Sequence, residues 1–134
     1  MSKIDFHILV IDDNEDILFV ISAMLKNIGY TVSTRDNVNN IEAAIMNDNP
    51  HIIIMDMHLS GADGCDICRE LKAKEEFKHI PILMISADPI AKNRCTEAGA
   101  DHFIEKPFEM KELIGMAQTF YDRFFPQTLS LNKD

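Results

Sequence analysis

Short apolar runs separated by amphipathic stretches make up most of this chain. Three runs, at residues 6–11, 52–55 and 80–85, are almost continuously apolar and rich in isoleucine and leucine. Runs of this length and composition are typical of strands buried on both faces, as in the middle of a parallel sheet. Two further strands are predicted at residues 30–35, which alternate and have high β-propensity, and at residues 102–104.

Stretches with apolar residues at helical spacing follow these runs. They predict helices at residues 14–28, 38–49, 65–74, 89–98 and 110–125. Asp13 or Asn14 is placed to cap the first helix, and Gly29 lies just past its end. Pro50 and Pro126 mark the ends of the second and last helices, because a residue before proline is disfavoured in the helical region.

The order of these elements predicts an α/β fold. Five strand–helix units in a row imply a parallel sheet with helices on both faces. The chain has 134 residues, enough for one domain and too few for a second one of any size. We assign the domain to residues 1–126 and expect residues 127–134 to be a flexible C-terminal tail.

The charge balance narrows the range of partners. With 13 basic and 22 acidic residues, the formal net charge is -9, which argues against nucleic acid or an anionic membrane as a partner and favours a basic protein surface. The sequence has no run of 18 apolar residues and no signal-peptide core after Met1, so we expect a soluble, cytoplasmic protein. Three cysteines, an odd number, fit a reducing compartment.

Four of the five predicted strands end in a reactive polar group. Asp12 and Asp13 follow the first strand, Asp56 the third, Ser86 the fourth and Lys106 the fifth. Carboxyl ends of parallel strands meet at one edge of the sheet, so neighbouring first and third strands would bring three carboxylates together. Two like charges about 4 Å apart repel by roughly 4 kcal/mol at an effective dielectric near 20, so this cluster requires a cation or protonation.

The chemistry at this edge points to phosphoryl transfer. Carboxylate oxygens with open water positions favour Mg²⁺, and soft ligands for zinc are absent from the edge. A metal ion, the Ser86 hydroxyl and the Lys106 ammonium can neutralise phosphoryl oxygens while a carboxylate attacks phosphorus. Asp56 is the better candidate nucleophile, because Asp12 and Asp13 form a pair suited to holding metal.

These strand-end motifs resemble the receiver domain of two-component response regulators, of the single-domain kind that resembles chemotaxis regulators. The resemblance spans about residues 6–122 and is carried by Asp12-Asp13, by HIIIMDMHLSGADG around Asp56, by Ser86-Ala87 after IPILMI, and by Lys106-Pro107-Phe108 in AGADHFIEKPF. Each motif alone is weak, but their order and their places at strand ends make the match specific. It implies a flavodoxin-like (βα)5 three-layer sandwich with strand order 2-1-3-4-5.

The resemblance also implies roles for the strand-end residues. Asp56 would accept a phosphoryl group from a sensor histidine kinase or a histidine phosphotransfer protein. Asp13, Asp56 and the backbone carbonyl of His58 would bind Mg²⁺, with Mn²⁺ as an alternative ion, and Asp12 would act mainly through metal-bound water. Lys106 would pair with the phosphate, and the Lys106–Pro107 peptide bond would be cis.

A switch is implied around the phosphorylation site. Ser86 would reorient to hold a phosphoryl oxygen, and Phe103 would turn inward. Binding of a downstream protein target would then change on the face made by the fourth helix, the fifth strand and the fifth helix. The chain would be a monomer or a weak phosphorylation-dependent dimer, and a switch with self-catalysed transfer and slow autodephosphorylation rather than an enzyme. The start at Met1 favours a free-standing regulator.

Four positions near the site, residues 58, 60, 87 and 88, bear on loop rigidity or phosphoryl lifetime. Receivers often carry proline where this chain has Ser60, so we expect a looser loop after Asp56. His58 and Asp88 lie two residues beyond Asp56 and Ser86, at positions that tune phosphoryl lifetime in the family, as does Ala87 beside them. Either side chain could orient attacking water or repel the phosphoryl group, and the sequence does not choose between these.

Other functions were weighed against this one. A degenerate receiver that binds partners without phosphorylation is the nearest alternative. An aspartyl-phosphate phosphatase would carry a second aspartate where this chain has His58, and a flavin-binding domain would need a phosphate-cradling loop where residues 12–16 are acidic.

Cysteines and aromatic residues add two further questions. Cys65 and Cys68 have the spacing of a redox dithiol, but they share one helical side with Leu71, so buried packing is expected, and Cys95 is distant in sequence. Four aromatic residues crowd the end of the last helix, at positions 120, 121, 124 and 125. Half of that ring should be exposed, either because the helix overhangs as a frayed end or because it offers a partner or dimer contact, which we favour.

Overall fold

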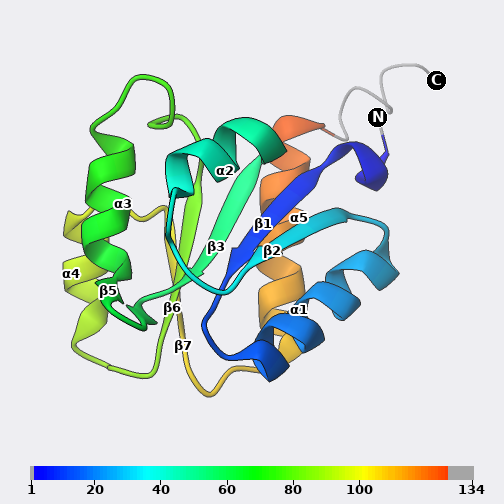
Figure 1. The fold of residues 1–134 in the computed structure, drawn as a ribbon. Helices are drawn as coiled ribbons and strands as arrows, with labels where there is room; N and C mark the ends of the chain where they lie inside the picture. The colour runs from blue at the N-terminus through cyan, green and yellow to red at the C-terminus, as the bar shows by residue number, and fades with distance from the viewer. Residues whose placement is uncertain (1, 127–134) are drawn as a thin grey trace.

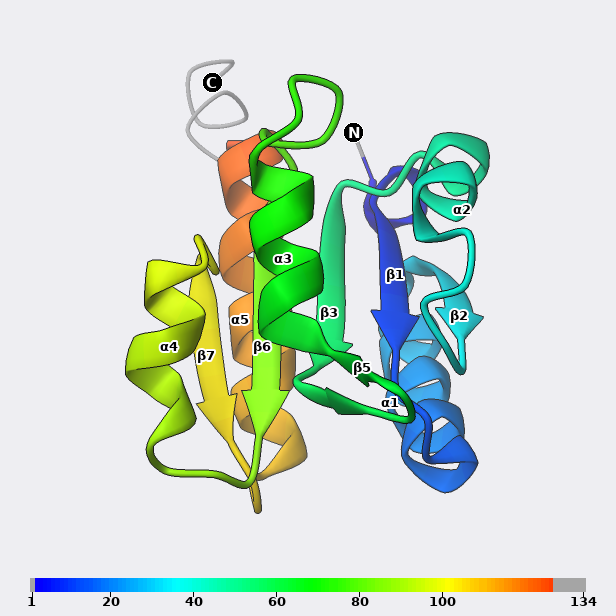
Figure 2. The ribbon, with the colours of Figure 1, turned by 60° about the vertical axis from the view of Figure 1, so that its left-hand side comes forward.

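Five parallel strands form one sheet in the order β2-β1-β3-β6-β7 in the computed structural model, which describes residues 2–126 (Figure 1). The strands are β1 (His7–Ile11), β2 (Thr31–Arg35), β3 (Ile52–Asp56), β6 (Ile82–Ser86) and β7 (His102–Glu105). Their arrows point the same way in Figure 2. The predicted order 2-1-3-4-5 is confirmed, because β6 and β7 are the fourth and fifth strands of this sheet. The predicted tail at residues 127–134 lies outside the described residues.

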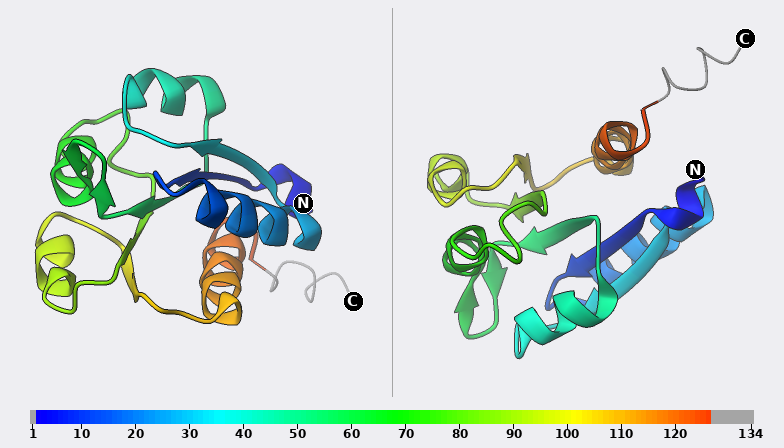
Figure 3. Two further views of the ribbon diagram at one scale, coloured as in Figure 1. Left: turned by 60° about the horizontal axis from the view of Figure 1, so that its bottom comes forward. Right: turned by 90° about the horizontal axis from the view of Figure 1, so that it is seen from above.

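Helices cover both faces of the sheet, as predicted for a flavodoxin-like fold. They are α1 (Glu15–Ile28), α2 (Ile41–Asp48), α3 (Gly64–Lys72), α4 (Ala91–Glu97) and α5 (Met110–Phe124), after a short 3-10 turn at Lys3–Asp5. Buried side chains of α2, α3 and α4 pack on one face, and those of α1 and α5 pack on the other (Figure 3). None of the helices within residues 2–126 has the length and apolar character that a bilayer crossing needs.

Two hydrophobic cores differ in composition. The sulfur-rich core, between the sheet and α2, α3 and α4, contains aliphatic residues together with Met55, Met57, Met84, Cys65, Cys68 and Cys95. The aromatic core, between the sheet and α1 and α5, contains aliphatic residues together with Phe6, Tyr30, Phe120 and Tyr121. Strand β1 contributes to both, since Leu9 and Ile11 enter the first core and Ile8 and Val10 the second, as alternation of side chains along a strand requires.

Local signals account for most helix boundaries. The Asn14 side chain accepts hydrogen bonds from the backbone N–H groups of Asp16 and Ile17, which caps α1, and Gly29 ends it at a φ of 124°. The predicted start of the fourth helix at Pro89 is wrong, because α4 begins at Ala91. The backbone N–H of Ile90 donates to the Asp88 carboxylate, which holds the preceding residues in a separate turn.

The segment after Asp56 forms a hairpin, which the sequence did not predict, and whether it is looser than in relatives with proline at position 60 stays a prediction. Strand β4 (His58–Leu59) pairs antiparallel with β5 (Ala62–Asp63), and the hairpin crosses below the ends of β1 and β3 in Figure 2. Ser60 and Gly61 form its two-residue turn, where Gly61 adopts a φ of 73° that glycine permits without strain.

The end of α5 is about half covered within the chain, as expected for its four aromatic residues. Phe120 and Tyr121 are buried, and Phe124 is 41% exposed. The rings of Tyr121 and Phe124 lie 5.6 Å and 5.7 Å from that of Phe6, which immediately precedes β1. The intramolecular partner of the helix end was missed because Phe6 is more than one hundred residues away in sequence.

Candidate functional site

Three carboxylates meet where β1 and β3 end. The register pairs Ile11 with Met55, so Asp12 and Asp56 lie side by side at the carboxyl edge of the sheet. Carboxylate oxygens of Asp12, Asp13 and Asp56 lie within 4.8 Å of one another. Asp12 and Asp56 are buried, whereas Asp13 is exposed. The cluster predicted from the strand ends therefore forms, because adjacent parallel strands place their last residues together.

Lys106 is the cation next to this cluster. Its Nζ atom lies 3.0 Å from Asp56 Oδ2 and 3.7 Å from Asp12 Oδ2. Residue 106 is held there because its backbone N–H donates to the carbonyl of Ser86 at 2.8 Å, next to the last residue pair of β6 and β7. The Lys106–Pro107 peptide bond is cis, as the resemblance to receivers implied. One ammonium group faces three carboxylates, so the cluster keeps an excess of negative charge.

Asp12 carries the strongest sign that this cluster suits a cation. Its Oδ2 atom is buried and has no hydrogen-bond partner among the residues that the structure describes. Burial raises the pKa of Asp12 above its ordinary value, and the charge of Asp56 adds to this effect. A buried carboxylate oxygen without a donor is costly unless a cation or a proton compensates its charge. The oxygen donors, their close spacing and this oxygen, which accepts no hydrogen bond within the described residues and lies 3.7 Å from Lys106 Nζ, fit Mg²⁺, which binds few carboxylates and keeps several waters.

The Asp56 side chain is oriented by neighbours on both of its oxygens. Oδ1 accepts a hydrogen bond from the backbone N–H of His58 at 3.1 Å, while Oδ2 pairs with Lys106. Gly64, the first residue of α3, packs against the backbone of Asp56 and Met57. A Cβ atom at position 64 would lie 2.7 Å from the Asp56 carbonyl oxygen and 2.9 Å from Met57 Cα. Only glycine allows α3 to approach the end of β3 this closely.

Ser86 lies beside Asp56 in the sheet but its hydroxyl is held by the following turn. Ser86 is fully buried, and its Oγ accepts a hydrogen bond from the backbone N–H of Asp88 at 3.0 Å. The Asp88 carboxylate is occupied by the backbone N–H of Ile90, so it caps the turn before α4. Ala87 is exposed, and Phe103 is half-buried against the sulfur-rich core. The roles given to these residues by the resemblance stay predictions.

The hairpin adds one residue to the site that sequence reasoning did not place there. Ser60 donates two hydrogen bonds to Asp13 Oδ2, from its backbone N–H at 2.9 Å and from its hydroxyl at 2.8 Å. The sequence signal was the serine at a position where receivers often have proline, but we had interpreted it as a matter of loop rigidity. The side chain of His58 is exposed on the same hairpin, and whether its carbonyl binds metal stays a prediction.

An apolar hollow of about 540 Å³ adjoins Lys106. It lies between the start of α1 and the chain after β7, and its lining includes Ile17, Val20, Ala87, Pro107 and Phe108. A larger hollow of about 720 Å³ lies between α1 and β2, but it contains none of the predicted site residues. The volume of a hollow therefore does not identify the site in this protein, whereas the carboxylate cluster does.

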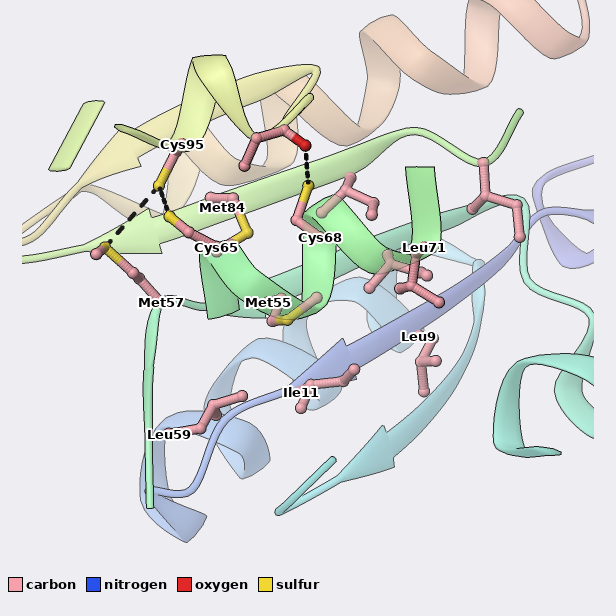
Figure 4. Packing of buried hydrophobic residues seen from close by; sticks show 14 of the residues in the cluster. Leu9, Ile11, Met55, Met57, Leu59, Cys65, Cys68, Leu71, Met84 and Cys95 are labelled. Carbon is pink, nitrogen blue, oxygen red and sulfur yellow. Dashed lines mark hydrogen bonds between the residues drawn. The ribbon is translucent and has the colours of Figure 1, made fainter. Parts of the chain in front are cut away.

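The three cysteines are packed in the sulfur-rich core (Figure 4). Cys65 Sγ lies 2.9 Å from Cys95 Sγ, and Cys68 Sγ lies 3.6 Å from the carbonyl oxygen of Ala98. All three residues are fully buried, and burial raises the pKa of Cys68 to about 11 and that of Cys95 to about 12. Protonated, inaccessible thiols are unreactive, which supports packing over redox chemistry. The neighbour of Cys65 is the cysteine that we had set aside as distant.

Comparisons with known proteins identify the family of this chain. The model of the response regulator receiver domain family matches residues 8–118. A putative response regulator from Chloroflexus aurantiacus is 29% identical with a TM-score of 0.80, over 86% of this chain and 96% of that one. Vibrio cholerae chemotaxis protein CheY4 is 25% identical with a TM-score of 0.78, over 86% and 98%.

A third structure bears on the metal. The receiver domain of a Pseudomonas aeruginosa sensor histidine kinase is 30% identical, with a TM-score of 0.76 over 86% of this chain and 96% of that one, and has a magnesium ion coordinated in its active-site cleft. In all, 408 chains of solved structures match this one, so the likeness does not depend on one structure. The family match covers well over half of the sequence, and the chain belongs to the response regulator receiver domain family.

Proposed function

We propose that this chain is the phosphoacceptor module of a two-component phosphorelay, in which Asp56 takes a phosphoryl group from a phosphohistidine. The observation that carries this proposal is the place of Asp56, which ends β3 within 3.0 Å of Lys106 and in one cluster with Asp12 and Asp13. The phosphoryl donor would be a sensor histidine kinase or a histidine phosphotransfer protein, as expected for the family.

The chain's own residues account for most of the transfer chemistry. A carboxylate oxygen of Asp56 attacks phosphorus, the bond between phosphorus and the donor's imidazole nitrogen breaks, and the imidazole leaves. The Lys106 ammonium, which lies beside Asp56, would pair with the negative charge on the phosphoryl oxygens. Asp12, Asp13, Asp56 and the His58 carbonyl would hold Mg²⁺, or Mn²⁺ in its place, which supplies positive charge for the same oxygens.

The surface beside Lys106 supports a protein donor. The apolar hollow beside Lys106 offers a surface on which a donor protein can pack while its histidine reaches the site. The net charge of -9 favours a partner with a basic surface and disfavours nucleic acid. Ion pairs with such a partner would increase the association rate more than the binding affinity.

The output would be a change of binding at the α4–β7–α5 face. Ser86 Oγ accepts a hydrogen bond from the backbone N–H of Asp88, and its own hydroxyl hydrogen could be donated to a phosphoryl oxygen. Phe103 would then move inward against the sulfur-rich core, where methionine side chains can adapt to it. The downstream target would be a protein, and the chain would act as a switch that is a monomer or a weak phosphorylation-dependent dimer.

Intact mass spectrometry with a small-molecule phosphoryl donor tests this function. Acetyl phosphate with MgCl₂ should add the mass of one phosphoryl group, and the adduct should be labile to base. Asp56→Asn should abolish it, and chelation of Mg²⁺ with EDTA should do the same. Asp36→Asn changes an exposed aspartate outside the cluster and serves as the matched control, which should be labelled like the wild type.

Two outcomes would contradict the proposal. An adduct that persists in Asp56→Asn would place the phosphoryl group elsewhere. Absence of any adduct in the wild type, from both acetyl phosphate and a phosphorylated histidine phosphotransfer protein, would favour the degenerate receiver that binds partners without phosphorylation.

A further inference from the structure

We propose that Ser60 is a metal-positioning residue, which holds the Asp13 carboxylate in the acidic cluster through its backbone N–H and its hydroxyl. The inference rests on the proposed function, since it concerns the metal site of the same phosphoacceptor. It assigns a role to the turn of the β4–β5 hairpin, which neither the family match nor the sequence motifs gave.

Both donors of Ser60 reach the same oxygen. The N–H and Oγ of Ser60 lie 2.9 Å and 2.8 Å from Asp13 Oδ2. A carboxylate has two oxygens and about four acceptor positions, so Oδ1 stays available for another ligand. With these bonds in place, one carboxylate oxygen of Asp13 is within 4.8 Å of oxygens of Asp12 and Asp56. The clamped conformation is therefore one in which Asp13 already belongs to the cluster.

Asp13 needs such a restraint more than its neighbours do. It is exposed, whereas Asp12 and Asp56 are buried, so it is the member of the cluster that can swing into solvent. Repulsion from two nearby carboxylates favours that movement. Carboxylates that bind metals are usually held by further hydrogen bonds, and removing those partners typically lowers metal affinity by about 10- to 100-fold. Ser60 supplies this support from 47 residues away in sequence.

The turn geometry allows both donors to be removed without disturbing the hairpin. Ser60 and Gly61 are the two central residues of the turn, and Gly61 has a φ of 73°. The non-glycine residues with positive φ in the described part of the chain are Asn40 and Asn49, so φ at Ser60 is negative. Negative then positive φ is the pattern of a type II turn, which favours proline at its first central position. Ser60→Pro therefore suits the turn and lacks both donors.

Three variants separate the two donors. Ser60→Thr keeps the N–H and the hydroxyl, Ser60→Ala keeps only the N–H, and Ser60→Pro keeps neither. Because the chain has no tryptophan, Mg²⁺ binding is measured by heteronuclear NMR titration of the unphosphorylated protein. We expect the dissociation constant to be unchanged in Ser60→Thr, about threefold higher in Ser60→Ala and about tenfold higher in Ser60→Pro. The rise in Tm on adding Mg²⁺ should shrink in the same order.

Measurements without metal separate positioning from stability. Tm in EDTA should change little across the series, since the turn is retained. Equal Mg²⁺ affinities in the wild type and Ser60→Pro would overturn the proposal and leave the proposed function standing. Tighter binding in Ser60→Pro would overturn it as well, by showing that Ser60 competes with the metal. A wild type that does not bind Mg²⁺ would instead contradict the metal site of the proposed function.

Discussion

The two faces of the sheet are built from different kinds of side chain. Five rings lie around Phe6 at centroid distances of 5.1 Å to 6.2 Å, those of His51, Tyr30, Tyr121, Phe124 and Phe125. The opposite face holds methionines and cysteines beneath α3 and α4 (Figure 4). Aromatic rings bury large areas in few orientations, whereas methionine is flexible and fills irregular space. The difference indicates that the aromatic core holds one packing arrangement, whereas the sulfur-rich core can repack.

The site lies at the edge shared by both faces, but Ser86 and Phe103, the residues proposed for its switch, connect to the sulfur-rich core. The turn after Ser86 leads into α4, whose buried residues Ala91 and Cys95 enter the sulfur-rich core. Phe103 packs against the same core. A helix that moves on phosphorylation would therefore move over side chains that tolerate new arrangements, while α1 and α5 stay on the aromatic face.

One substitution in each core gives the largest test of this contrast. Phe120→Ala, in the aromatic core, should lower the free energy of unfolding by about 3–5 kcal/mol, because it leaves a cavity that rigid neighbours cannot fill. Met84→Leu, in the sulfur-rich core, conserves volume and should cost less than about 1.5 kcal/mol. Urea denaturation measures both. A cost for Met84→Leu equal to that of Phe120→Ala would show that the sulfur-rich face is no more adaptable than the other.

Two glycines offer a matched pair across the faces. Gly64→Ala should destabilise the protein by about 1–3 kcal/mol, because the added Cβ would lie within 3 Å of the backbone of Asp56 and Met57, which cannot move aside. Gly115→Ala, on the exposed side of α5, meets nothing within 4 Å and should stabilise by about 0.5–1 kcal/mol. Thermal unfolding distinguishes the two signs, and a loss in Gly115→Ala would contradict the packing described for α5.

Low pH should destabilise the fold through the aromatic core, and high pH should destabilise it through the sulfur-rich core. Burial lowers the pKa of His51 below its ordinary 6.5, so its neutral form stabilises the fold. That stability is present above pH 6.5 and is lost as pH falls through the folded-state pKa. Burial raises the pKa of Cys95 from 9.0 to about 12, so the corresponding loss begins as pH rises above 9.

NMR titration and variants check the predicted losses of stability at low and at high pH. The imidazole of His51 should titrate below pH 6.5, and His51→Gln should lose less stability between pH 7 and pH 5 than the wild type does. Cys95→Ala should likewise reduce the loss between pH 9 and pH 11. A His51 titration midpoint above 6.5 would contradict the burial of its ring against Phe6.

Most of the fold and the core of the site could be predicted from the sequence. Apolar runs and helical spacing are local signals, so they placed all five strands of the sheet and five helices, and boundaries such as α4 shifted where a turn intervened. The edge residues Asp12, Asp56 and Lys106 could be assigned together because every strand of a parallel sheet ends at the same edge. That inference needs the direction of the strands and no knowledge of side-chain contacts.

Contacts between distant segments were decided only by the tertiary structure. The thiol nearest to Cys65 belongs to Cys95, on another helix, and not to Cys68 in the suggestive spacing. Ser60 meets Asp13 because a hairpin folds back under β1, and Phe6 meets the end of α5 for a similar reason. Hydrophobic periodicity fixes which side of an element is buried, but which residues touch across elements depends on the packing of all of them at once.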